Sequence, residues 1–293
     1  MIVERRHMIF AACCLLIALV NIQILRQLLG LSQTHEFASM IPLMPFLSAA
    51  LIYRNRKNIF GLVKDSWVAG AGLIALGVAI LILVAFANLG PLEVDALSIK
   101  AGGIVSLLLG SFLVAYGWDS FKKALFPLLM LLFMIPIPET WLAAAIHALQ
   151  RGSAEGVAIL FQLTGTPFHR EGLTFALPRT TIEIAPQCSS IRSSLALLIS
   201  CLLAGHLILR TTSRKFVLVL VAIPMAMMKN SIRIVTLSLL AIHVDMGYLA
   251  GSDLHRRGGI VFFILTLLLM WPVIWILRKT EKGHKLNELK RNE

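Results

Sequence analysis

The chain has 293 residues, of which 58% are hydrophobic and 14% are charged, and its mean hydropathy is +0.83. Soluble domains carry roughly one-quarter charged residues, so this composition excludes an ordinary water-soluble protein. The net charge of +12 does not indicate nucleic-acid binding, because the basic residues form small clusters between apolar runs and not one folded face. We therefore expect a single membrane domain over residues 1–293 with the lipid bilayer, and no nucleic acid, as its surroundings.

Eight apolar runs predict transmembrane helices, because a helix satisfies its own backbone hydrogen bonds in lipid. They cover residues 8–28, 40–53, 67–88, 99–117, 123–138, 189–209, 216–243 and 258–278. The second and fifth are short for a crossing, which needs roughly 17 to 25 residues. The length of the first run and its missing small-residue cleavage site favour a retained anchor over a cleaved signal peptide. The expected fold is an all-α polytopic membrane protein with about eight transmembrane helices.

The distribution of lysine and arginine predicts the orientation through the positive-inside rule. A cytoplasmic N-terminus places 17 of the 27 basic residues inside, whereas the outer loops carry mainly acidic residues. The inside set is Arg5, Arg6, Arg54, Arg56, Lys57, Lys64, Lys122, Lys123, Arg210, Arg214, Lys215 and six residues from Arg278 to Arg291. Eight crossings return the C-terminus to the cytoplasm, so we expect a protein of the inner (cytoplasmic) membrane whose residues 279–293 form a cytoplasmic basic tail.

Residues 139–187 are the longest stretch outside the predicted spans, and they are expected on the outer face. Apolar residues between 140 and 163 recur at helical spacing around Arg151 and Glu155, which favours a helix lying at the membrane interface. Residues 173–184 then alternate apolar with polar or small residues around Pro178-Arg179, which predicts a small β-hairpin. The hairpin leads directly to Cys188.

Cys188 is the first candidate for chemistry. It immediately precedes the sixth apolar run, so we expect it in the first turn of a helix, where free backbone N–H groups favour thiolate over thiol. Arg192 lies four residues later, on the same helical face, and its cation would lower the thiol pKa further. The alternative is an interfacial cysteine without a function. Cys13, Cys14 and Cys201 lie within apolar runs and are expected to serve packing.

Arg233 is the second candidate, because an ionisable residue inside an apolar run needs a pairing or functional explanation. Counted from Phe216, 17 residues raise it by roughly 26 Å, which is the expected depth of Cys188. Asn230 lies three residues earlier on the same face and could hold the guanidinium or a substrate carbonyl. The alternative is an arginine that reaches toward the outer headgroups.

His255 is the third candidate, at the outer start of the last run and beside Arg256 and Arg257. A histidine can take and return a proton near neutral pH, as a thiol nucleophile requires. His206 falls near the inner end of its helix, away from Cys188, whereas His243 remains an alternative. A cysteine, a histidine base and an arginine that stabilises an oxyanion form an acyl-transfer arrangement.

These motifs resemble, in order and spacing, the exosortase and archaeosortase family of membrane cysteine transpeptidases. The similarity runs over residues 123–263. It rests on Phe133-Met134-Ile135-Pro136-Ile137-Pro138, on Leu163 to Gly172, on Cys188-Ser189 with Arg192, on Asn230-x-x-Arg233 and on His255 to Gly259. Two departures stand out. The family usually has glycine where Ser190 stands, and the third catalytic position is histidine in exosortases but arginine in archaeal relatives, so Arg256 competes with His255.

The resemblance implies that Cys188 is the nucleophile and that Arg233 and His255 complete the site, with Ser189, Arg192, Asn230 and Arg256 in support. The implied partners are exported proteins with a C-terminal Pro-Glu-Pro-like motif, a transmembrane helix and a basic tail. Such proteins would be cut and transferred to another acceptor at the outer surface. Some members carry an extra C-terminal domain, which we do not expect here. In Gram-negative bacteria the family often accompanies exopolysaccharide production.

Two other functions remain as alternatives. A non-enzymatic component of exopolysaccharide assembly or export would tolerate replacement of Cys188 but not disruption of residues 140–163. A small-solute transporter would need midplane ionisable groups and a repeat, and the sequence displays neither. The sequence also contains no metal-ligand cluster and no nucleotide-binding loop, so we expect no cofactor and no metal.

Overall fold

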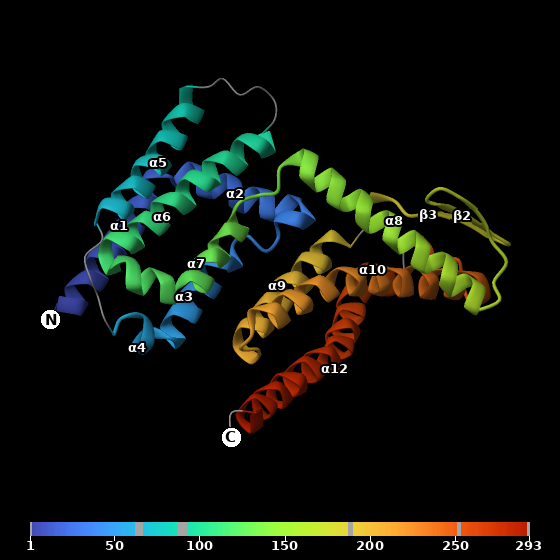
Figure 1. Ribbon diagram of the computed structural model, residues 1–293. Coiled ribbons are helices and arrows are strands. Elements are labelled where there is room, and N and C mark those ends of the chain that lie inside the picture. The colour runs from blue at the N-terminus through green and yellow to red at the C-terminus, as the bar shows by residue number, and fades with distance from the viewer. Residues whose placement is uncertain (1, 62–66, 87–92, 187–189, 251–252, 292–293) are drawn as a thin grey trace. The chain divides into compact units, whose positions relative to one another are not determined.

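The computed structural model describes residues 2–61, 67–86, 93–186, 190–250 and 253–291, and the chain divides into two compact units, Met1–Leu142 and Ala143–Glu293 (Figure 1). The first contains α1 (Ile2–Val20), α2 (Ile22–Thr34), η1 (Glu36–Ala38), α3 (Leu43–Arg54), α4 (Arg56–Ile59), α5 (Trp67–Phe86), α6 (Glu93–Lys123), α7 (Leu125–Met130) and η2 (Leu131–Met134). The second contains most of α8 (Glu139–Leu163), then β1 (His169–Glu171), β2 (Thr174–Leu177), β3 (Thr180–Glu183), α9 (Ile191–Ile208), α10 (Thr212–His243), α11 (Gly247–Ala250) and α12 (Asp253–Arg291).

Within the described residues, six helices are long and apolar enough to cross a bilayer. They are Glu36–Arg54, Trp67–Phe86, Val94–Lys123, Ile191–Ile208, Thr212–His243 and Ile260–Glu281. Two bent helix pairs raise the number to eight if each pair is one span. The predicted all-α polytopic fold is therefore confirmed, and each of the eight predicted runs corresponds to one of these helices or pairs.

Two of the eight predicted runs belong to bent helix pairs. The first run breaks at Asn21, where α1 and α2 meet at 75°; the Asn21 amide donates a hydrogen bond to the carbonyl of Ile17. The fifth run forms only Leu125–Met134, and it meets α8 at 96°. Pro136 and Pro138 lie between those two helices, and proline cannot continue a helix because it lacks the N–H and its ring clashes with the preceding turn.

Helices α5 and α6 lie side by side in the first unit and pack through glycine (Figure 1). A Cβ added at Gly70 would lie 2.5 Å from Val114 Cγ2, and one added at Gly77 would lie 2.8 Å from the carbonyl oxygen of Gly103. Only glycine permits such a close approach of two apolar helices. Helix α6 has a non-helical residue at Gly117 (φ 77°), where the predicted span 99–117 ends.

The second unit carries a three-stranded antiparallel sheet in the order β1-β2-β3. Strands β2 and β3 confirm the predicted hairpin, and Phe175 of β2 pairs with Ile182 of β3. Strand β1 was not predicted, because His169-Arg170-Glu171 contains no apolar alternation. Arg170 donates a 2.7 Å hydrogen bond to Glu155 of α8, and this bond raises the pKa of Arg170.

The sheet packs against α8 and α10, and the predicted helix at 140–163 is confirmed as α8. One buried cluster joins Phe175, Leu177, Ile182 and Ile184 of the sheet region to Val157 and Phe161 of α8 and Val235 of α10. A second cluster joins α9, α10 and α12 through Leu197, Cys201, Leu218, Ala222 and Met270. These two clusters hold α8, α9, α10 and the end of β3 around a group of buried polar side chains.

Candidate functional site

A buried polar cluster lies in the second unit, where α8, α10 and the beginning of α9 meet. Its members share an exposed fraction of 7% or less; they are Ser153, Ser190, Lys229, Asn230 and Ser231. A polar group that is buried without a hydrogen-bond partner costs several kcal/mol in an apolar surrounding, so such groups are paired in stable structures. The pairing within this cluster connects segments that are distant in the sequence.

Asn230 is the centre of the cluster. Its Oδ1 accepts a 2.8 Å hydrogen bond from Ser190 Oγ, and its Nδ2 donates a 3.0 Å hydrogen bond to Ser153 Oγ. One amide side chain on α10 therefore fixes both α8 and the residue that precedes α9. Because a carboxamide has a donor group and an acceptor group, it can make both bonds at once.

Two cations flank Asn230 on the same face of α10. Arg233, one turn later, donates a 3.2 Å hydrogen bond from Nη1 to Ser190 Oγ. Lys229, immediately before Asn230, donates from Nζ to Ser193 Oγ on the first turn of α9. The beginning of α9 thus lies between a guanidinium and an ammonium group, and an anion that forms there would be stabilised by both charges.

Two glycines on α8 make this arrangement possible. A Cβ added at Gly156 would lie 2.3 Å from Ser231 Oγ, and one added at Gly152 would lie 2.3 Å from Met227 Sδ. Ser231 Oγ also donates a 2.9 Å hydrogen bond to the carbonyl of Ser153. The Gly-x-x-x-Gly spacing lets α8 touch α10, as small residues do between membrane helices, and it brings Ser153 within reach of Asn230.

Ser190 has a backbone conformation that favours glycine. Its φ of 54° and ψ of 34° lie in the left-handed region, where a residue with a Cβ costs about 1–2 kcal/mol. Ser190 is the N-cap residue of α9, but its side chain makes no capping bond and bonds to Asn230 and Arg233 instead. The two side-chain bonds offset the cost of the backbone conformation.

The start of α9 corrects one part of the sequence argument. The helix begins at Ile191, three positions after Cys188, whereas the prediction placed Cys188 in the first helical turn. The argument that Arg192 shares a helical face with Cys188 depends on that turn and does not apply. The Arg192 side chain is exposed.

The segment that carries Cys188 begins and ends at buried residues. On one side, the carbonyl of Ile184 accepts a 2.6 Å hydrogen bond from Gln150 of α8, and the Ile184 side chain is 1% exposed. On the other side, Ser190 is held by Asn230. Gln150 and Ser153 lie three residues apart on one face of α8, so this helix bonds directly to Ile184 and, through Asn230, indirectly to Ser190.

Four of the other predicted site residues lie wholly or partly outside the description. Cys188 and Ser189 lie outside the described residues, and His255 and Arg256 lie in the first turn of α12 with side chains outside the description. His243 lies at the end of α10, ten residues or about 15 Å along the helix from Arg233, and its Nδ1 pairs with the carbonyl of Leu239. The structure therefore brings Asn230 and Arg233 together with Ser190.

Sequence reasoning missed Gln150, Gly152, Ser153, Gly156 and the contact made by Lys229. Two signals were present: the Gly152-x-x-x-Gly156 spacing, and the position of Gln150 and Ser153 on the face of α8 that also carries Val157 and Phe161. Neither signal identifies α10 as the partner helix, because its Asn230 and Ser231 lie more than 70 residues from Ser153.

A helical membrane chain whose amide, guanidinium and ammonium groups meet at the beginning of one helix belongs to the class of polytopic membrane proteins with an internal polar site. The comparison with protein families is more specific. A model of the transmembrane exosortase family matches residues 32–272, so the chain belongs to that family. No curated protein and no solved structure matches the chain.

Proposed function

We propose that this exosortase is a cysteine protease or transpeptidase that cleaves the C-terminal sorting signals, of the PEP-CTERM type, of exported proteins. The Cys188 thiolate attacks the carbonyl of the scissile peptide bond, so that a C–S bond forms and the C–N bond breaks. His255 supplies the proton that the leaving amine needs. Water or a second nucleophile then attacks the thioester and releases the thiol.

The observation that carries this proposal is that Ile184 and Ser190, which flank residues 185–189, are both buried and hydrogen-bonded. Two peptide units separate Cys188 from Ser190, so their Cα atoms lie within about 7 Å of each other. Arg233 bonds to Ser190, so its guanidinium lies within two residues, along the chain, of the position assigned to the nucleophile. A catalytic group must be held in a fixed geometry, and the buried, hydrogen-bonded residues on either side of residues 185–189 support the assignment of the nucleophile to this segment.

The two cations suit the charges that develop in this reaction. The attack places negative charge on the carbonyl oxygen, and a guanidinium donor stabilises such an oxyanion. Nearby positive charge also lowers the pKa of a thiol and favours the thiolate. In this assignment Arg233 contacts the oxyanion, whereas Lys229 acts through the electrostatic field and through Ser193 as a positioning residue.

An apolar pocket beside the site supports a membrane-embedded substrate. It has a volume of about 250 Å3 and lies between α8, α9 and α10, with Ile191 and Ser194 of α9 in its lining. The rest of the lining is apolar and consists of Ala145, Ala148, Leu149, Leu195, Leu198, Ala222, Ile223, Ala226 and Met227. An apolar pocket next to the site suits side chains of the apolar segment that follows a sorting motif.

The charge distribution supports the orientation that the proposal requires. With eight crossings, the five basic clusters, from Arg5-Arg6 to the tail, all lie on one side of the membrane, as the positive-inside rule expects. If either bent pair fails to cross, at least one cluster changes side. We therefore propose an inner-membrane protein with both termini in the cytoplasm and the site at the outer side.

Replacement of the thiol tests the proposal. Cys188→Ala is compared with Cys13→Ala, which removes a thiol from α1, in cells that co-express a protein with a C-terminal sorting signal. We expect no cleaved product with Cys188→Ala at unchanged membrane abundance, and parental cleavage with Cys13→Ala. Cleavage by Cys188→Ala at the parental rate would overturn the proposal and favour a non-enzymatic role.

A further inference from the structure

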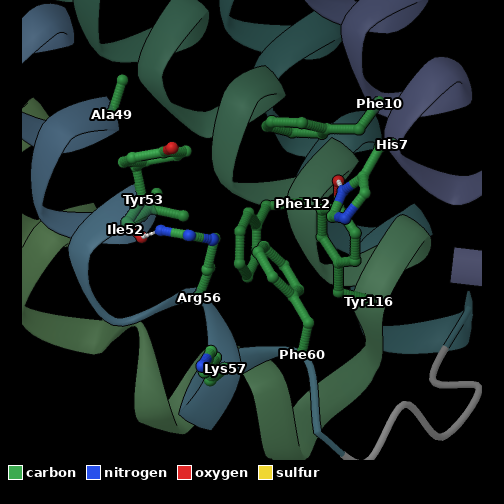
Figure 2. A pocket seen from close by; sticks show the side chains of 10 residues that line it. All are labelled: His7, Phe10, Ala49, Ile52, Tyr53, Arg56, Lys57, Phe60, Phe112 and Tyr116. Carbon is green, nitrogen blue, oxygen red and sulfur yellow. Dashed lines mark hydrogen bonds between the residues drawn. The ribbon is translucent and has the colours of Figure 1, made fainter. Parts of the chain in front are cut away.

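The first unit contains a pocket that the proposed function does not use. Its volume is about 660 Å3, within the range of small-molecule sites, and residues of α1, α3, α4 and α6 line it (Figure 2). All of these elements belong to the unit Met1–Leu142. The pocket therefore exists independently of the cluster around Asn230.

One wall of the pocket is aromatic and tightly packed. The ring centroids of Phe60 and Tyr116 lie 4.6 Å apart, and those of Phe112 and Tyr116 lie 4.8 Å apart. Tyr116 also pairs with Nδ1 of His7 at 2.7 Å. Phe10 packs against the same group, with its ring 5.6 Å from that of Phe112. These contacts fix the wall in place and leave an apolar surface toward the pocket (Figure 2).

The other side of the pocket carries two cations. Arg56 and Lys57 line it, and both side chains are exposed. The Arg56 guanidinium lies 4.1 Å above the ring of Tyr53, and its Nη1 donates a 3.0 Å hydrogen bond to the Tyr53 carbonyl (Figure 2). These contacts orient a group with five N–H donors, of which one is used in that bond. Among the ten described residues that line the pocket, none is acidic.

The pocket lies where an apolar helix becomes polar. Helix α3 is apolar from Leu43 to Tyr53, and it is followed by the polar run from Arg54 to Asn58. Ala49 and Ile52 line the pocket from the apolar side of this boundary, whereas Arg56 and Lys57 line it from the polar side. A phospholipid changes from acyl chain to phosphate at the corresponding level of a bilayer.

We infer that this pocket binds an anionic membrane phospholipid. The phosphate lies against Arg56 and Lys57, and the first part of an acyl chain lies along Ile52, Phe112 and Phe10. A second copy of the chain, or its own basic tail, would bring positive charge to a positive site and is disfavoured. A zwitterionic lipid offers the same chain but no net charge to match the two cations.

Lipid retention by the purified full-length protein tests the inference. The protein is prepared in an uncharged detergent, phosphatidylglycerol or phosphatidylcholine with identical acyl chains is added, and the bound lipid is measured by native mass spectrometry. We expect the parent to retain phosphatidylglycerol preferentially. Arg56→Gln/Lys57→Gln weakens that binding by roughly tenfold, since each basic side chain near a membrane surface contributes to anionic-lipid attraction.

Two controls make the result specific. Arg54→Gln/Lys123→Gln removes the same charge from exposed positions of the same unit that do not line the pocket, and it keeps the preference. Ala49→Trp fills the pocket and lowers retention of the anionic lipid, whereas Ala50→Trp, at the neighbouring exposed position, does not. The inference is wrong if the two double variants bind phosphatidylglycerol equally, or if inorganic phosphate competes as well as the lipid does and so identifies a simple anion site.

Discussion

The two units of this protein bury polar side chains in different ways. In the first unit, the described polar groups bond mainly to backbone carbonyls: Asn21 to Ile17, Ser98 to Val94 and Pro136, and Ser106 to Leu73. In the second unit, Ser190, Asn230 and Ser153 bond side chain to side chain, and Asn230 lies 40 and 77 residues from its partners. The first arrangement satisfies each side chain through a backbone carbonyl, whereas the second joins three segments in one network of side chains.

The two kinds of hydrogen bonding suit different purposes: the first suits helix packing, and the second suits a functional site. When a serine hydroxyl donates to a backbone carbonyl, its hydrogen-bonding need is met and two helices can approach each other. An apolar residue of similar size could replace such a serine at small cost. A network of side chains in an apolar surrounding is costly unless every member is paired, so its presence calls for a further reason. Glycine serves both units: Gly70 and Gly77 bring apolar helices together, whereas Gly152 and Gly156 bring polar side chains together.

Loss of the guanidinium has the largest expected effect. Arg233→Gln should reduce the cleavage rate by roughly 100- to 1,000-fold, which is the usual consequence of removing one oxyanion donor. The matched variant Arg151→Gln removes the same charge from an exposed position on α8 and should leave the rate unchanged. The rates are measured as cleaved product per amount of folded enzyme in detergent. Equal rates for the two variants would show that the polar network of the second unit is structural.

A methyl group at the α8–α10 crossing has the next largest effect. Gly156→Ala places a Cβ 2.3 Å from Ser231 Oγ, and the helices must separate, at a cost of about 1–3 kcal/mol in the free energy of unfolding. The thermal midpoint in detergent and the cleavage rate should both fall. Gly30→Ala, at a position with no atom within 4 Å, is the control and should be neutral or slightly stabilising. Unchanged stability of Gly156→Ala contradicts the close crossing.

Removal of the buried ammonium group separates stability from activity. Lys229→Met keeps the apolar stem, and it removes a charge whose hydrogen-bond partner, Ser193, is neutral. Burying a charge is costly, so the thermal midpoint should rise, while the cleavage rate should fall by about tenfold because the site loses one of its two cations. A lower midpoint with an unchanged rate means instead that Lys229 has only a structural role.

Two serines, one from each unit, give the smallest and most direct contrast. Ser190→Ala leaves the Asn230 amide without its donor and should cost about 1–3 kcal/mol, whereas Ser106→Ala should cost about 1 kcal/mol and leave cleavage unchanged. Ser190→Gly loses the same bonds but relieves the left-handed conformation, so it should be more stable than Ser190→Ala by about 1 kcal/mol. Thermal unfolding of the three variants measures this order, and Ser190→Ala as stable as Ser190→Gly contradicts it.

The sequence predicted the features that repeat locally. Apolar runs located the helices, helical spacing predicted α8, and alternation predicted β2 and β3. Asn230 and Arg233 stood out as polar residues in an apolar run, and both bond to Ser190, but their catalytic roles remain predictions. Features set by distant contacts were not predictable in this way. The left-handed Ser190 bonds to α10, and the bend at Asn21 falls inside a run that the apolar pattern predicts as one span. Cys188 as the nucleophile remains a prediction.

The central claim is that Cys188, which lies in the sequence between the buried residues Ile184 and Ser190, forms a thioester with the substrate. Mass spectrometry of the peptide that contains Cys188, after brief reaction with a sorting-signal substrate, tests it most directly. The account predicts an adduct on Cys188 that carries the N-terminal part of the cleaved substrate and that neutral hydroxylamine releases. Cleavage of the substrate with no adduct on Cys188, or with an adduct on another residue, would contradict the account.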